Sequence, residues 1–210
     1  MRIAVVSEVS AVDRNPDLVA SLEGRGHEVI NAGMCGKGDK PELLYVHTGF
    51  LAALLLHACR VDFVVGGCGT GQGFLNSAMQ YPGVFCGLLL GPLDAWLFSR
   101  INAGNCVSLP LNQGYGWAAD VNLRLLFDSL FGPDRGAGYP AHRSEVQAGA
   151  RALLGRISSA THRGFAEIVR ALPDEVLAPA VEQLRARRLL DLESLADRAL
   201  REAFAARVPR

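Results

Sequence analysis

The sequence predicts an α/β protein built on a doubly wound, five-stranded parallel sheet, with a helical extension at its C-terminal end. Five short apolar runs recur over the first 130 residues, and a segment with helical spacing follows each of them. Continuous apolar runs, unlike alternating ones, are typical of parallel strands that helices cover on both faces. From about residue 145 onward only helical patterns remain, which predicts the extension.

The strands are predicted where apolar and β-branched residues gather between turn residues. They are RIAVVS (2–7), HEVINAG (27–33), VDFVVGGC (61–68), GVFCGLLL (83–90) and NCVSLPL (105–111). The helices that follow them are PDLVASLEGRG (16–26), ELLYVHTGFLAALLLHACR (42–60), FLNSAMQ (74–80), PLDAWLFSRINAG (92–104) and GWAADVNLRLLFDSLFG (116–132). With right-handed crossovers, this order gives a Rossmann-like three-layer sandwich.

The chain changes character after residue 132. PDRGAGYPAHRSE (133–145) is rich in Gly and Pro and predicts an ordered arm rather than a sheet element. Two amphipathic helices are predicted further on, one after Pro173 and one over LLDLESLADRAL (189–200). We therefore divide the chain into an α/β domain (1–145) and a helical extension (146–210), which carries no catalytic motif and is expected to serve packing or dimerisation.

Composition excludes several classes of protein. Twenty-one basic and twenty-one acidic residues cancel, so no global charge favours nucleic acid or an anionic membrane as a partner. The most apolar segment, FLAALLLHAC, has half of the ~20 residues that a membrane span needs, and MRIAVVSEVS is too polar for a signal peptide. The five cysteines are widely spaced without a C-x-x-C pair, which argues against zinc and disulfides and favours free thiols in a reducing cytoplasm.

The loop GGCGTGQG (66–73) is the strongest candidate for a functional site, because ligands bind beyond the carboxyl ends of strands in open α/β sheets. Backbone amides of such a turn can surround an anion, and a helix terminus favours the thiolate of Cys68. The alternative is a tight turn with an inert cysteine packed beneath it. A dinucleotide site is rejected, because its fingerprint normally follows the first strand and needs an acidic residue about 20 positions on.

GGCGTGQG resembles the active-site loop of the ribose-5-phosphate isomerase B and galactose-6-phosphate isomerase family. The resemblance continues through RIAVVSEVS near the start of the chain and YPGVFCGLLLGPLDAWLFSRINAGN (81–105), and covers roughly residues 1–145. It implies isomerisation of an aldose and a ketose, free or phosphorylated, through an enediolate, with no metal or organic cofactor. It also implies a homodimer in which the C-terminal arm of one subunit completes the neighbour's site.

The resemblance also implies roles for individual residues. Cys68 is the base, and Thr70 stabilises the oxyanion together with backbone amides of the loop. The residues expected to bind substrate are Glu8, Gly69, Gly71, Gly73, Asn102, Arg135, His142 and Arg143, with the two arginines on the phosphate.

Three departures from the family pattern predict an altered substrate. The Asp-His pair after the first strand is Glu8-Val9, the histidine thought to open the cyclic sugar is Ile101, and a basic residue expected after the fifth strand falls near Asn112 or Gln113. Isoleucine cannot protonate a ring oxygen, which favours an open-chain substrate or one that closes into a different ring.

Two further points stay open from the sequence. His47, His57 and His142 could each replace the missing acid. His142 on the arm is the better candidate, since His57 lies in an apolar helix and is expected to be a core histidine. A non-catalytic protein that binds a small polyol or anion is the alternative to the isomerase. An exposed, reactive Cys68 would favour the enzyme, and a buried inert thiol would favour the binding protein.

Overall fold

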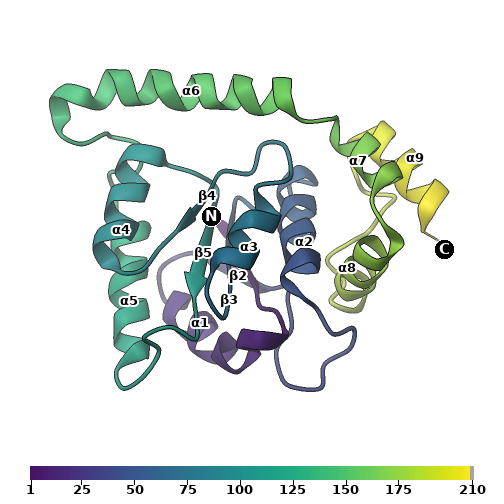
Figure 1. Ribbon diagram of the computed structural model, residues 1–210, viewed down its shortest axis with the longest axis horizontal. Helices are drawn as coiled ribbons and strands as arrows, with labels where there is room; N and C mark the ends of the chain where they lie inside the picture. The colour runs from purple at the N-terminus through teal and green to yellow at the C-terminus, as the bar shows by residue number, and fades with distance from the viewer. Residues whose placement is uncertain (209–210) are drawn as a thin grey trace.

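The computed structural model describes residues 1–208 and contains the predicted sheet (Figure 1). Its strands are β1 (Arg2–Val6), β2 (Glu28–Asn31), β3 (Phe63–Cys68), β4 (Cys86–Leu88) and β5 (Cys106–Pro110). They pair in parallel in the order β2-β1-β3-β5-β4, so the predicted α/β class with a parallel sheet is confirmed.

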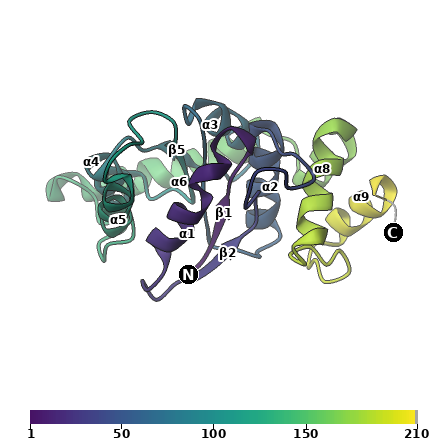
Figure 2. The ribbon, with the colours of Figure 1, turned by 90° about the horizontal axis from the view of Figure 1, so that it is seen from below.

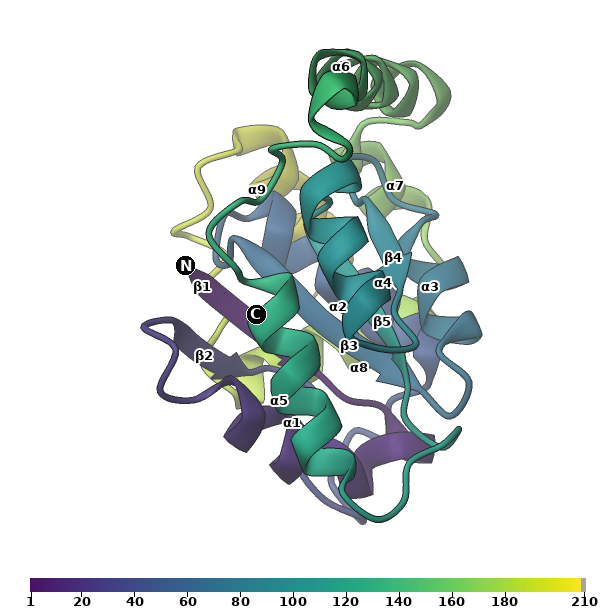
Figure 3. The ribbon, with the colours of Figure 1, turned by 90° about the vertical axis from the view of Figure 1, so that its left-hand side faces the viewer.

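Helices cover both faces of the sheet because each strand buries side chains on both sides. In β1, Ile3 and Val5 join the core beneath α1 (Asn15–Leu22) and α5 (Ala119–Leu130), whereas Ala4 and Val6 join the core beneath α2 (Tyr45–His57). Figure 3 shows α1, α4 (Pro92–Leu97) and α5 in front of the strands, with α2 behind them. The short helix α3 (Gln72–Ala78) packs beside α2.

Helix α2 is apolar around its whole circumference, which is typical of a helix buried on every side. Residues 50–55 are all buried, because the sheet covers one side of α2 and the helical extension covers the other. Within residues 1–208, no helix combines the length and the apolarity that crossing a membrane requires.

The extension consists of α6 (Ser144–Thr161), α7 (Phe165–Ala171), α8 (Asp174–Ala186) and α9 (Arg198–Arg207). In Figure 1, α6 runs across the top of the molecule, and Figure 2 shows α8 and α9 at the opposite end from α4 and α5. Apolar residues of α7, α8 and α9 join the core that contains α2. The division at residues 145 and 146 stays a prediction; it falls in the first turn of α6, and the two parts share one core.

The predicted helix after Pro173 is α8, but the prediction of one helix over 189–200 is wrong for most of its length. Residues 189–197 form turns and loop, and α9 begins at Arg198. Polar side chains explain the difference, since Asp191 accepts the N–H of Glu193 (3.1 Å) and Asp197 caps α9 by accepting the N–H of Leu200 (3.2 Å).

The histidine expected in the core, His57, lies half-buried in the last turn of α2. Its ring stacks on Phe165 of α7, with centroids 4.1 Å apart and planes at 13°. Burial lowers the pKa of His57, and a contact with the carbonyl of Ala53 (3.3 Å) opposes that effect only in part. His57 is therefore a packing residue between the body and the extension.

We expect the free energy of unfolding to fall as the pH falls below about 6.5, the pKa of an unfolded histidine. The folded pKa of His57 is lower, so in this window the unfolded chain binds a proton that the folded chain does not, and acid favours unfolding. Urea denaturation at pH 7.5 and 5.5 measures the change. His57→Phe keeps the stacking and should reduce the change, whereas His142→Gln, at an exposed histidine, should not. An equal pH dependence in wild type and His57→Phe contradicts this assignment.

Candidate active site

The glycine-rich loop links the end of β3 to α3, and its glycines meet close packing constraints. A Cβ atom on Gly67 would lie 2.4 Å from the carbonyl oxygen of Leu109, because β3 and β5 approach closely there. Gly71 has φ +74°, a left-handed conformation, and a Cβ atom on it would lie 2.5 Å from a methyl carbon of Leu88. Packing alone thus explains why glycine occupies positions 67 and 71. Any catalytic role of this loop depends on the side chains of Cys68 and Thr70.

Cys68 ends β3 at the carboxyl edge of the sheet. Its Sγ lies 3.9 Å from Oγ1 of Thr70, and the residue is 6% exposed. The carbonyl of Cys68 accepts the N–H groups of Gly71 (3.3 Å) and Leu111 (3.0 Å), which fixes the turn. The thiol and the threonine hydroxyl therefore lie in contact with each other, while their roles as base and oxyanion donor stay predictions.

The amides of the loop are not all free to bind an oxyanion. The N–H of Gly69 donates to Oγ of Ser10 (3.0 Å), and the N–H of Gly71 donates to the carbonyl of Cys68. The N–H of Thr70 has no acceptor within residues 1–208. Thr70 therefore offers both a free amide and a hydroxyl, while a direct role of Gly69, Gly71 or Gly73 in binding substrate stays a prediction.

Glu8 lies beside this loop, two residues after the end of β1. It is 3% exposed, and its carboxylate accepts a hydrogen bond from the hydroxyl of Ser10. Asn112, after β5, donates its side-chain amide to the carbonyl of Ser10 (2.8 Å) and its backbone N–H to the carbonyl of Gly69 (3.0 Å). The loops after three neighbouring strands are thus tied together. Sequence reasoning missed Ser10, because a serine two residues after Glu8 carries no signal by itself.

Asn102 and Ile101 lie near the amino ends of the strands, at the opposite end of the sheet from Cys68. Helix α4 starts beyond the carboxyl end of β4 and runs back, and the π-helical segment Phe98–Asn102 leads into the start of β5. Ile101 and Asn102 line a cavity of about 510 Å³ beneath α6, together with apolar residues such as Phe98 and Leu154. A single chain therefore does not bring Asn102 to Cys68.

The two arginines of the arm differ in their surroundings. Arg135 donates to the carbonyls of Ala103 (3.1 Å) and Gly104 (2.5 Å), its guanidinium lies 5.1 Å from the ring centroid of Phe63, and burial lowers its pKa. It braces the amino edge of the sheet, so its contact with phosphate stays a prediction. Arg143 is exposed in the turn before α6, and its side chain has no partner within residues 1–208.

His142 precedes Arg143 in the same turn, Ala141–Arg143, and is exposed. No residue of the described chain forms a hydrogen bond or ion pair with its ring. Both side chains of this turn are thus free for a ligand, but they belong to the start of α6 rather than to the loops around Cys68.

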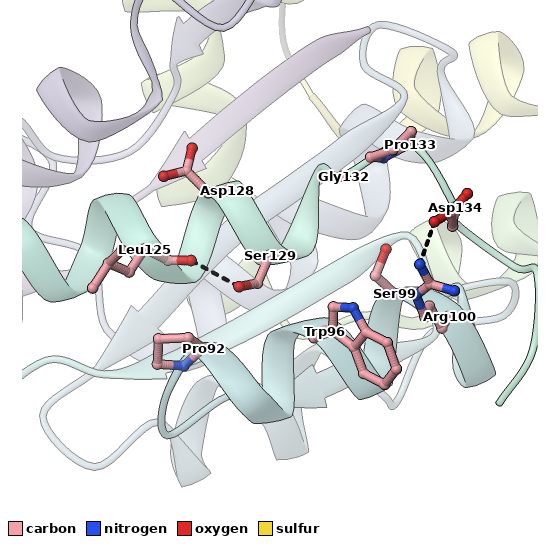
Figure 4. A pocket seen from close by; sticks show the side chains of 10 residues that line it. All are labelled: Pro92, Trp96, Ser99, Arg100, Leu125, Asp128, Ser129, Gly132, Pro133 and Asp134. Carbon is pink, nitrogen blue, oxygen red and sulfur yellow. Dashed lines mark hydrogen bonds and ion pairs between the residues drawn. The ribbon is translucent and has the colours of Figure 1, made fainter. Parts of the chain in front are cut away.

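A separate cavity of about 390 Å³ lies between α4 and α5 (Figure 4). The guanidinium of Arg100 in this cavity pairs with Asp134 and lies 4.6 Å from the ring centroid of Trp96. Its charge is therefore already satisfied, and the cavity lacks the thiol chemistry of the loop. Within residues 1–208, no three His, Cys, Asp or Glu side chains cluster in a way that could hold a metal ion.

Comparison with known proteins decides the family. The sequence profile of the Ribose/Galactose Isomerase family matches residues 3–120. The chain belongs to this family. It is also similar along its length to the structure of a 4-deoxy-L-threo-5-hexosulose-uronate ketol-isomerase complexed with a tartrate, with 33% identity, 98% of each chain covered and a TM-score of 0.90. The predicted family is thus confirmed, and this member of it is a sugar isomerase.

Two further solved structures differ in how much of this chain they match. A ribose-5-phosphate isomerase from Vibrio parahaemolyticus shares 37% identity over 98% of this chain and 92% of its own, with a TM-score of 0.81. A ribose-5-phosphate isomerase B from Clostridium thermocellum, at 21% identity and a TM-score of 0.61, covers 76% of this chain but 99% of its own, and shows the fold alone. The ketol-isomerase and the Vibrio protein therefore match the extension as well. No curated protein matches the chain.

The low exposure of Cys68 and the family membership favour different functions. Taken alone, a thiol in a residue that is 6% exposed favours the binding protein. The family profile and the relatives over the whole chain favour the enzyme, and they carry more weight because they cover far more than one side chain.

Proposed function

We propose that this isomerase interconverts an aldose and a ketose through an enediolate, with Cys68 as the base, and that its substrate is an open-chain acidic sugar. The observation that carries the mechanism is the grouping at the carboxyl edge of the sheet. There the thiol of Cys68 faces the hydroxyl of Thr70 at 3.9 Å, the amide of Thr70 is unpaired, and Glu8 lies on the neighbouring loop.

In this mechanism, the Cys68 thiolate removes the proton from the carbon beside the carbonyl. The electron pair of the broken C–H bond forms the C=C bond of the enediolate, and the carbonyl oxygen takes up the negative charge. The hydroxyl and amide of Thr70 donate to that oxygen, where their stabilisation matters most. Cys68 then returns the proton to the former carbonyl carbon, while a hydroxyl proton passes between the two oxygens. Glu8, as an acceptor, holds substrate hydroxyls.

The substrate class follows from Ile101 and the relatives. A hexosulose-uronate without a hydroxyl at C4 and with a carbonyl at C5 cannot close onto C1 as a furanose or a pyranose. Such a substrate, which the name of the ketol-isomerase describes, has no hemiacetal ring at C1 for an acid to open, in agreement with the isoleucine at position 101. Ribose-5-phosphate is the second candidate, favoured by the 37% identity with the Vibrio enzyme.

We also propose that the active unit is a homodimer with shared sites. Asn102, His142 and Arg143 lie away from the Cys68 of their own chain, so a second copy is the simplest way to bring them to it. An apolar surface supports such contact, because α6 is exposed along most of its length. Its exposed large apolar residues are Val146, Leu153, Leu154 and Ile157. Arg143 and His142 of one subunit would then bind the acidic group of the substrate in the other.

Mixing Cys68→Ala protein with Arg143→Ala protein is expected to restore activity that neither variant has alone. Random pairing places one intact site in each hybrid dimer, so an equal mixture should reach about a quarter of the wild-type activity. Activity before and after subunit exchange, with the mass in solution from light scattering, measures this. A fully active monomer, or a mixture no better than the sum of its parts, contradicts shared sites.

The proposed reaction is tested by following deuterium incorporation from D2O by NMR. We expect exchange at the carbon beside the carbonyl in the 4-deoxy-5-ketouronate, with slower exchange in ribose-5-phosphate. A screen of aldoses and aldose phosphates without any exchange would favour the non-catalytic binding protein.

A thiol base also requires a reducing compartment, and we propose the cytoplasm; the five cysteines are all free in the structure.

A further inference from the structure

Ser10 lies at the rim of the site with two fixed polar partners. It is exposed, yet its hydroxyl contacts both the buried carboxylate of Glu8 and the N–H of Gly69 (3.0 Å). The side chain of Asn112 holds the backbone carbonyl of Ser10 at 2.8 Å, so the position of this serine is set by the loops on either side.

These partners determine how the hydroxyl is oriented. The backbone N–H of Gly69 can only donate, so the oxygen of Ser10 accepts from it. An ionised carboxylate can only accept, so the proton of the hydroxyl points to Glu8. A serine hydroxyl has one donor and two acceptor positions, which leaves one lone pair of Ser10 free on the solvent side.

We propose that Ser10 is a specificity-determining residue that accepts a hydrogen bond from a substrate hydroxyl; this rests on the proposed function of the same site. A free lone pair attracts a hydroxyl proton and repels an oxyanion. The carbonyl oxygen, which gathers negative charge, therefore lies toward Thr70, and a hydroxyl that stays protonated lies toward Ser10 and Glu8. Ser10 thus fixes the direction in which the substrate lies across the site.

Binding of tartrate and succinate tests this assignment without relying on turnover. Both are four-carbon dicarboxylates, but only tartrate has hydroxyls, and a tartrate occupies the structure of the related ketol-isomerase. We expect wild type to bind tartrate more tightly than succinate, measured by calorimetry. Ser10→Ala should reduce that preference by about tenfold, the usual size of one hydrogen bond in a polar site. Succinate binding should hold or improve, because the freed N–H of Gly69 can donate to a carboxylate.

Two variants serve as controls. Ser10→Thr keeps the hydroxyl and should keep the preference for tartrate. Ser158→Ala also removes a hydroxyl that accepts a glycine N–H, that of Gly83 (3.0 Å), but at the amino edge of the sheet, and should bind both ligands as wild type does.

The possible outcomes separate the two proposals. If wild type prefers tartrate and Ser10→Ala keeps that preference, the assignment of Ser10 is overturned and the proposed function stands. If wild type binds tartrate and succinate equally, the assignment of Ser10 is overturned, because its hydroxyl then accepts no hydrogen bond from a ligand hydroxyl; deuterium exchange on the 4-deoxy-5-ketouronate tests the proposed function separately. Equal weakening of tartrate and succinate in Ser10→Ala, with a loss of thermal stability, also overturns the assignment, since it indicates a structural role.

Discussion

Cys68→Ala is expected to abolish deuterium incorporation beside the carbonyl while leaving the fold intact. A positioned general base contributes roughly 10²–10⁴-fold to such a step, and within residues 1–208 the hydrogen-bond partner of Sγ is the hydroxyl of Thr70, which is not a base near neutral pH. Alanine suits the end of β3, because Cys68 forms its strand and turn contacts through its backbone. NMR measures the loss of deuterium exchange, and the melting temperature shows whether the fold is intact.

A second cysteine provides the matched control. Cys59 is exposed in the turn between α2 and β3, at the amino edge of the sheet, and Cys59→Ala should exchange deuterium at the wild-type rate. Cys68→Ser is also informative, since a serine hydroxyl keeps the shape but does not ionise near neutral pH. Full exchange in Cys68→Ala would remove the assignment of the base and return the loop to a role in packing.

The strands and the glycine-rich loop after β3 could be predicted from the sequence because their signals are local. An apolar run such as 63–68 predicts a buried strand from its own residues, and a cluster of glycines after it predicts a tight turn, in which Gly71 has φ +74° without the strain that a Cβ atom would bring. The loop over 189–197 could not be predicted in this way. Its leucines have helical spacing, but Leu190 and Leu195 are buried although their backbone forms turns and loop. Polar groups of Asp191 and Ser194 form hydrogen bonds with the backbone there.

The site was harder to predict than the fold, because it depends on what each side chain contacts. Arg135 and Arg143 lie eight residues apart in one arm and look alike in the sequence. In the structure, Arg135 is half-buried against backbone carbonyls and Arg143 is exposed without a partner. Ser10 becomes a candidate only when the loops after β1 and β3 are seen to meet. Such long-range contacts leave no pattern along the chain.

The largest effect on substrate choice is expected between an open-chain and a ring-forming sugar. We expect kcat/KM for ribose-5-phosphate to be ~10²–10⁴-fold below that for the 4-deoxy-5-ketouronate, the range that one acid–base group contributes. The cyclic form of ribose-5-phosphate needs an acid at its ring oxygen, and Ile101 cannot supply one. The apolar side chain of Ile101 also offers no hydrogen bond to a ring oxygen that gathers charge. Steady-state kinetics on both substrates measures the ratio.

Ile101→His restores an ionisable group at this position and is expected to raise kcat/KM on ribose-5-phosphate alone. Ile101→Leu keeps the apolar volume and is the matched control, with both substrates unchanged. His142 is the residue that could replace the missing acid, since it is exposed on the arm. If ribose-5-phosphate is the best substrate and His142→Ala leaves its turnover unchanged, then neither residue opens the ring, and the interpretation of Ile101 is wrong. If His142→Ala abolishes the turnover of ribose-5-phosphate, His142 on the arm supplies the acid that position 101 lacks. Ile101 then does not determine substrate choice.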